Sequence, residues 1–290
     1  MFPPELAHLG FSSSTRRGIR YILPPSLPIS SGTFLMGSDA STDPDARSDE
    51  SPPHQVTLPT YYLGVYPVTV AEYACALASH PHWPPPVNWR SQSSHPTHPV
   101  SALTWVEAWR YTRWLTTISQ HAWRLPNEAE WEKAARGNDG RIYPWGNRFD
   151  AYRANCFSQG ETRATMTPVN QYPAGRSPYG MLDMCGNVSE WLSTIWNKKH
   201  FRYPYESTDG REILNTHASF RCMRGGCYLF PPSLVRTTAR HSFDITDRFD
   251  WLHGLRLASS SPPSRCSRDE TASVANERLG GSSHGQGQAY

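Results

Sequence analysis

The chain has 290 residues with a formal net charge of +3, and 38% of its residues are hydrophobic. This length allows one large domain with a full core, and the 11 Trp, 14 Tyr and 26 Pro favour a loop-rich fold over a helical bundle. Because the charge is spread along the sequence and no run approaches about 20 apolar residues, neither a nucleic-acid partner nor a membrane partner is expected.

Both ends of the chain are expected to be loose. Residues 1–21 lack the apolar core of a signal peptide and are predicted to form an N-terminal arm. Residues 259–290 are rich in Ser, Gly, Arg and Gln and are predicted to form a flexible tail. The folded domain should then span residues 22–258, and a soluble, cytoplasmic protein is expected.

The first regular elements of this domain are predicted to be two short strands. The segment 32–38 (Gly-Thr-Phe-Leu-Met-Gly-Ser) and the segment 54–58 (His-Gln-Val-Thr-Leu) have strand composition. The acidic, proline-containing loop between them, residues 39–53, is expected to be mobile.

Three helices are indicated by their N-terminal caps. Thr69 with Glu72, and Thr104 with Glu107, form capping boxes that open apolar segments reaching Leu77 and Ile118. Tryptophans follow the second of these helices at helical spacing, which predicts core packing. They are Trp105, Trp109 and Trp114.

The third helix should start after Asn127, which has Glu130 three residues on, and stop at Gly137. The rest of the domain reads as turns and short segments, so we expect a mixed α+β fold with little regular structure. The six cysteines contain no C-x-x-C pair, and buried thiols are expected. The histidine pairs at 80/82 and 95/98 lie among prolines, and solvated loop histidines are expected there.

Seven motifs occur in a fixed order: G-T-F-L-M-G-S at Gly32, Y-P-V-T at Tyr66, W-R-L-P-N-E-A-E-W-E-K-A-A-R-G at Trp123, Y-P-W-G-N at Tyr143, the segment from Gly180 to Trp191, R-G-G at Arg224 and G-L-R-L at Gly254. Together they resemble the formylglycine-generating enzyme (sulfatase-modifying factor) family. The resemblance implies an irregular α+β fold of the C-type-lectin-like class.

The resemblance also implies what this chain lacks. Catalytic members carry two cysteines shortly after R-G-G, whose thiolates bind copper. Here Phe230 stands at the first of these positions, and no cysteine follows in the short loop. Because Cu(I) selects soft thiolates, no copper and no copper-dependent catalysis are expected, and no catalytic residue is assigned. Cys227 stands where the family usually has Ser.

A calcium site is implied in the segment after Gly180. The family holds one Ca²⁺ at positions that match the side chains of Asp183 and Glu190 and the backbone carbonyls of Gly186 and Val188. Carboxylate and carbonyl oxygens suit Ca²⁺. The alternative is that the two acids only cap turns.

The segment between Arg224 and Leu257 has an unusual composition. From Tyr228 to His253 it contains no Lys, Glu, Gln, Met or Asn. This set of residue types resembles the variable region of target proteins of diversity-generating retroelements, in which adenines of Asn codons are randomised. Trp251 is the exception, because such randomisation does not produce Trp. The alternative is chance composition in a chain poor in Lys.

The resemblance predicts that specificity resides in residues 227–253 of the lectin-like scaffold. The candidate ligand-binding residues are Tyr228, Leu229, Phe230, Ser233, Val235, Thr237, His241, Phe243, Asp244, Thr246, Phe249, Trp251 and His253. The function predicted is non-catalytic binding of an unknown protein or surface ligand. The alternative is an oxidoreductase-type enzyme, or an accessory domain of the same family, that acts without the copper cysteines.

Overall fold

The computed structural model describes residues 2–157, 165–197, 199–214, 219–246 and 252–263. Its helices are α1 (Pro4–His8), α2 (Val70–Ser79), α3 (Trp89–Gln92), α4 (Trp105–Ser119) and α5 (Glu128–Arg136). Its strands are β1 (Ser12–Arg16), β2 (Ile19–Leu23), β3 (Ser26–Ile29), β4 (Gly32–Met36), β5 (His54–Leu58), β6 (Tyr61–Gly64), β7 (Ser189–Ile195), β8 (Phe220–Arg224), β9 (His241–Asp244), β10 (His253–Leu255) and β11 (Ala258–Ser259).

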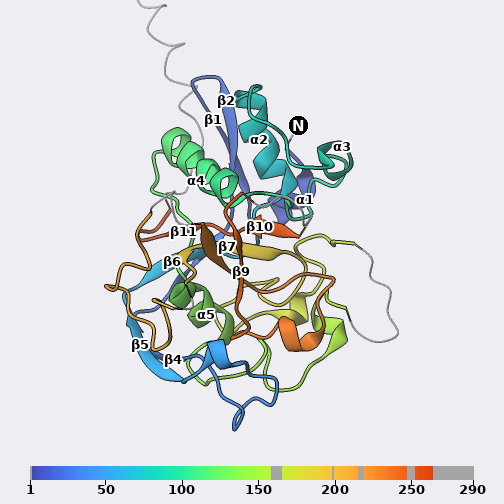
Figure 1. The fold of residues 1–290 in the computed structure, drawn as a ribbon. Helices are drawn as coiled ribbons and strands as arrows, with labels where there is room; N and C mark the ends of the chain where they lie inside the picture. The colour runs from blue at the N-terminus through green and yellow to red at the C-terminus, as the bar shows by residue number, and fades with distance from the viewer. Residues whose placement is uncertain (1, 158–164, 198, 215–218, 247–251, 264–290) are drawn as a thin grey trace, which may run out of the picture.

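Four small sheets divide these strands. The central sheet has the order β10-β7-β8-β9, and a second has the order β11-β6-β3, while β1-β2 and β4-β5 form two-stranded ribbons. Only β10 and β7 pair in parallel among the described strands. Figure 1 shows α2, α4 and the β1-β2 ribbon at one end of the molecule, and α5 with β4 and β5 at the other. Long connections fill the remaining volume, so the predicted mixed α+β class is confirmed.

The three predicted helices form where their caps indicated. In α5 the Asn127 side chain accepts from the Glu130 amide at 2.8 Å, and the Glu130 carboxylate accepts from the Asn127 amide at 2.9 Å. Reciprocal hydrogen bonds of the same kind open α2, between Thr69 and Glu72, and α4, between Thr104 and Glu107. These bonds satisfy amides that have no partner inside the helix, which is why the boundaries could be read from sequence. Strands β4 and β5 also pair as predicted.

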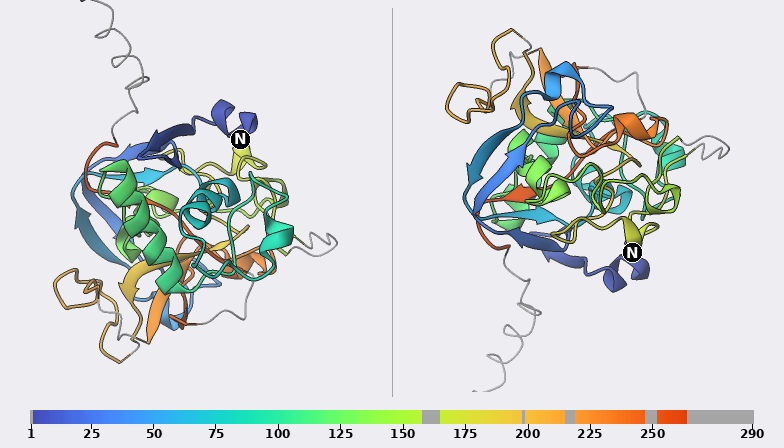
Figure 2. Two further views of the ribbon diagram at one scale, coloured as in Figure 1. Left: turned by 90° about the horizontal axis from the view of Figure 1, so that it is seen from above. Right: turned by 90° about the horizontal axis from the view of Figure 1, so that it is seen from below.

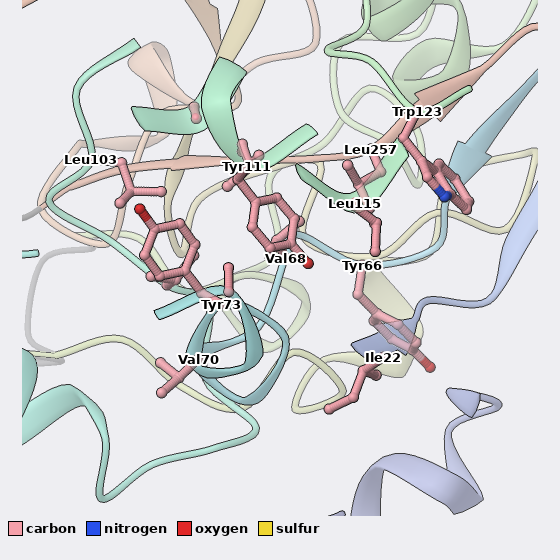
Figure 3. Packing of buried hydrophobic residues seen from close by; sticks show 14 of the residues in the cluster. Ile22, Tyr66, Val68, Val70, Tyr73, Leu103, Tyr111, Leu115, Trp123 and Leu257 are labelled. Carbon is pink, nitrogen blue, oxygen red and sulfur yellow. The ribbon is translucent and has the colours of Figure 1, made fainter. Parts of the chain in front are cut away.

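The largest core lies between α2, α4 and the β1-β2 ribbon. Tyr73 of α2 and Tyr111 of α4 stack with ring centroids 5.4 Å apart, and Figure 3 shows them facing each other beside Val68. Trp105 is fully buried and Trp114 is nearly so, whereas Trp109 is half-buried at the edge. Core packing of this aromatic row is therefore confirmed.

The N-terminal segment is not a loose arm. Leu6, Phe11 and Tyr21 are buried in the largest core, with Phe11 stacked on Tyr66 at 5.5 Å. Figure 2 shows α1 and the β1-β2 ribbon lying against the body of the domain. The sequence suggested an arm because its apolar residues are sparse, but Phe2, Leu9 and Ile19 also pack against this core. Most of the predicted tail, residues 264–290, lies outside the described residues.

Candidate functional site

Buried arginines hold the C-terminal third of the chain in place. Arg224 donates to Glu128 at 3.0 Å and to Glu132 at 2.6 Å, and Arg240 donates to Glu128 at 2.7 Å. Arg256 pairs with Glu190 at 2.7 Å. Buried ion pairs with several hydrogen bonds fix the geometry of the segments that carry them.

Glu128 shows how strongly these buried ion pairs, which form the arginine framework, interact with one another. Burial alone would raise the pKa of its carboxyl, but the guanidiniums of Arg240 and Arg224 outweigh burial and lower that pKa to about 2. Glu128 lies at the start of α5, so the helix and the strands β8 and β9 are joined through one carboxylate.

Arg236 fixes the acidic loop 39–53, which the sequence suggested to be mobile. Its guanidinium pairs with Asp43 and with Glu50, the latter at 2.7 Å, and all three side chains are buried. Thr238 also donates to Glu50 at 2.7 Å. Asp43 and Glu50 therefore serve as internal counter-ions that tie this loop to the domain, whereas Asp39 and Asp45 are more accessible. The expected mobility is wrong for the part of the loop that these ion pairs hold.

The R-G-G motif brings the chain after β8 tightly against the domain. Gly226 has φ +65°, and a Cβ there would lie 2.7 Å from Val235 and 2.8 Å from the carbonyl oxygen of Leu234. The short 3-10 helix Pro232–Leu234 thus packs directly on the glycine backbone. Any side chain at position 226 would push this helix outward.

The candidate ligand-binding residues divide into three groups in the structure. Val235, Thr237 and His253 are at most 1% exposed, so they are core residues and the prediction that they face a ligand is wrong. Phe249 and Trp251 lie outside the described residues. Accessible or half-buried positions are Leu229, Phe230, Ser233, His241, Phe243, Asp244 and Thr246, and Tyr228 is nearly buried.

Aromatic pairs form part of this accessible group. Phe230 lies 5.1 Å from His241 between ring centroids, and Phe243 lies 4.3 Å from the buried His253. Leu229 is 51% exposed beside the first pair. The segment thus presents apolar and aromatic side chains from a backbone that the buried arginines anchor, a combination common at binding surfaces.

Tyr228 lines a cavity of about 220 Å³ together with residues from distant parts of the chain. His95 and His98 line the same cavity, with ring centroids 4.8 Å apart. Burial, with a smaller contribution from His95, lowers the pKa of His98 to about 4, so its imidazole is neutral at physiological pH. His98 is a loop histidine as expected but is half-buried rather than fully solvated, and no sequence signal linked this pair to Tyr228.

The cysteines of the described residues are buried thiols. Cys227 is fully buried with Tyr228 and Leu252, and Cys75, Cys156, Cys185 and Cys222 are also buried. Phe230 packs against the cluster that contains Cys227. Cys266 lies outside the described residues. At position 230, therefore, an aromatic ring stands where the resemblance places the first copper-binding thiolate.

Three of the predicted calcium ligands, Asp183, Gly186 and Val188, lie in a tight turn before β7, and Glu190 lies near the start of β7 itself. Asp183 and Gly186 have positive φ angles, and a Cβ at Gly186 would lie 2.2 Å from the backbone oxygen of Asn155. Asn187 joins the turn together, donating to the Asp183 carboxylate at 2.8 Å and accepting from Asn155 at 3.1 Å.

The two carboxylates fit a cation unequally. Burial raises the pKa of Asp183 to about 7, which is the behaviour of a buried acid that lacks a compensating charge in contact. Glu190 instead receives Arg256 on both oxygens and the Trp131 indole at 2.7 Å. Ca²⁺ here would have to rely on Asp183 and the carbonyls of Gly186 and Val188, and Glu190 does not fit as a free ligand.

The family model described as "Sulfatase-modifying factor enzyme 1-like domain" matches residues 19–261. The chain belongs to this family. The predicted resemblance is thereby confirmed, and the match includes part of the segment that was expected to lie outside the domain.

Among curated relatives, the hercynine oxygenase of Mycolicibacterium smegmatis is 29% identical over 80% of this chain and 60% of its own. The serine/threonine-protein kinase Pkn1 of Chlamydia trachomatis is 32% identical over 73% of this chain and 34% of its own. The formylglycine-generating enzyme of Bos taurus is 28% identical over 70% and 68%. The chain thus spans about a third to two thirds of these relatives.

Two solved structures share the fold. PvdO from Pseudomonas aeruginosa superposes with a TM-score of 0.70 at 24% identity, covering 82% of this chain and 95% of its own. Treponema denticola variable protein 1 superposes with a TM-score of 0.64 at 18% identity, covering 87% and 99%. The expected formylglycine-generating-enzyme-type, C-type-lectin-like fold is confirmed. Within the described residues, no helix is long and apolar enough to cross a membrane.

Proposed function

We propose that this protein is a non-catalytic ligand-binding member of its family, and that its specificity resides in residues 227–253. One observation carries the proposal. Arg236 and Arg240 are buried in ion pairs, whereas the described stretches on either side of them, residues 229–234 and 241–244, are half-buried or exposed. A rigid framework with accessible side chains in between allows the surface to change without unfolding.

The proposal includes diversification of this surface by a retroelement. The composition of the segment supports it, as does the common fold with the Treponema variable protein. Deep sequencing of the gene across one population tests it. Substitutions should be concentrated at the codons of Leu229, Phe230 and Asp244, whereas the codons of Arg236 and Arg240 should stay constant. A uniform sequence, or variation spread evenly over the gene, would contradict diversification.

Ligand binding itself is tested separately from diversification. The wild-type protein and a Leu229→Ser/Asp244→Ser variant are applied to the same glycan and peptide arrays. We expect array ligands that the wild type binds and the variant does not, with melting temperatures within a few degrees of each other. Equal array profiles would place specificity elsewhere, and a large fall in melting temperature would show that these side chains are structural.

A second candidate is an enzyme or accessory domain that acts without the copper cysteines. The cavity of Tyr228, His95 and His98 favours it, because a neutral imidazole and a phenol line the same cavity. Three or more His, Cys, Asp or Glu side chains grouped for a metal are not found in the described part of the chain. Metal analysis and oxygen-consumption assays of the purified protein distinguish this candidate from the first.

A further inference from the structure

Acidic residues are nearly missing from one end of the molecule. Residues 6–38 contain Arg16, Arg17 and Arg20 and no acid, and residues 73–127 contain four arginines and a single acid, Glu107. Glu107 is buried in the cap of α4. These two stretches include the β1-β2 ribbon, most of α2 and all of α4, which pack together (Figure 1), and Glu72 at the start of α2 is fully buried. The overall charge of +3 therefore conceals a strongly basic end.

Four of these arginines line one groove of about 420 Å³ between the β1-β2 turn and α4. Arg16 and Arg17 come from the ribbon, and Arg110 and Arg113 lie one turn apart on α4. No acidic side chain lines the groove. In the described part of the chain, none of the four guanidiniums forms an ion pair, in contrast to the buried arginines of the framework.

The floor of the groove is apolar and aromatic. Trp83 and Trp114 line it with Ile19 and Ile118. The Trp83 indole is half-buried, with His80 stacked on it at 4.5 Å and the Arg110 guanidinium 5.4 Å from its ring centroid. Guanidinium groups above an aromatic floor can contact phosphates and planar bases at the same time.

The turn of the ribbon places an arginine where the backbone disfavours it. Arg16 pairs with Ile19, so Arg17 and Gly18 form a two-residue turn with φ +51° and +76°. Asn followed by Gly is the preferred sequence for such a turn, and a long side chain at positive φ costs stability. A strained position occupied by an exposed cation at the rim of a groove points to a function for that side chain.

From these observations we propose that the groove binds single-stranded nucleic acid, with the phosphates between the two pairs of arginines and a base or sugar on the apolar floor. The concave shape with cationic walls on both sides suits a chain that lies within it better than a flat lipid surface. The groove shares no lining residue with the Tyr228 cavity, and the proposal does not rest on the ligand-binding function proposed above. The even spread of charge along the sequence had suggested no such partner.

Fluorescence anisotropy of a labelled oligothymidylate with the full chain tests the proposal. For single strands, the logarithm of the binding constant falls with the logarithm of salt concentration with a slope of about −0.7 per phosphate contact. Four arginines therefore predict a slope of about −3, and an Arg110→Ala/Arg113→Ala variant should reduce it to about −1.4. The matched control is Arg148→Ala/Arg176→Ala, which removes two exposed arginines outside the groove and should leave the slope near that of wild type.

A second variant separates binding from folding. Arg17→Asn should raise the melting temperature, because Asn suits the turn, and should weaken oligonucleotide binding at the same time. The proposal is overturned if the control double variant weakens binding as much as the groove variant does. It is also overturned if no binding is seen at low salt, or if phosphatidylserine vesicles or polyglutamate compete as well as unlabelled oligonucleotide.

Discussion

Replacing Glu72 with Gln should make the stability of this protein less dependent on pH. Glu72 lies in the first turn of α2 and is fully buried. One carboxylate oxygen accepts from the backbone amide and the hydroxyl of Thr69, each at 2.7 Å. The other oxygen is buried with no hydrogen-bond partner among the described residues. Burial raises the pKa of Glu72 to about 8, against the opposing hydrogen bonds from Thr69.

The sign of the pH effect follows from proton binding. Between pH 4.5 and about 8 the folded protein keeps the Glu72 proton, whereas the unfolded chain has lost it. Stability therefore falls as pH rises through this interval, and above pH 8 the full penalty is present. At about 1.4 kcal/mol for each unit, a shift of this size is worth on the order of 5 kcal/mol. Gln has nearly the same shape, can still accept from Thr69 and carries no charge.

Urea unfolding followed by tryptophan fluorescence measures the effect. At a pH near 4.5, wild type and Glu72→Gln should have free energies of unfolding within about 1 kcal/mol of each other. At a pH above 8 the variant should be more stable by several kcal/mol. A difference between the two proteins that is the same at both pH values would refute the reasoning, because it would show that the carboxyl does not titrate between them.

The remaining predictions concern the framework, the turn before β7 and the exposed segment. Arg240→Met should lower the free energy of unfolding by about 3–5 kcal/mol, because it removes one of the two arginines that compensate the buried Glu128; a loss below about 1 kcal/mol in urea unfolding would contradict this. The stability that Glu128 contributes should be lost as pH falls from 4.5 through about 2, since its folded pKa is lowered, and Glu128→Gln should flatten this acid limb. If the Ca²⁺ site that the resemblance implies exists on Asp183, millimolar Ca²⁺ should raise the melting temperature of wild type in a thermal scan, but not that of Asp183→Asn; no rise in wild type would contradict the site. Leu229→Ser alone should change stability by less than about 1 kcal/mol, because the side chain is half exposed, and a larger loss would place it in the core.

The sequence determined the family, the fold class and the boundaries of the three capped helices α2, α4 and α5. Each of these depends on local or ordered features: the capping boxes at Thr69 and Thr104 satisfy amides within one turn, and the glycine-containing motifs keep their order along the chain. The missing thiolates were also visible, since Phe230 at the first position and the lack of a cysteine after it are matters of residue identity. Such information needs no knowledge of which distant segments meet.

Only the tertiary structure decided which side chains are accessible and which charges are paired. Val235 and Thr237 have the same kinds of side chains as their exposed neighbours, but Val235 packs on Gly226 and Thr237 donates to the carbonyls of Arg141 and Ile142, so both are buried. The acidic loop was expected to be mobile, but Arg236, almost 200 residues away, pairs with its Asp43 and Glu50. The basic groove likewise needs Arg17 and Arg113 together. Burial and ion pairing depend on contacts between segments that are distant in sequence. The order of residues along the chain does not show which of these segments meet.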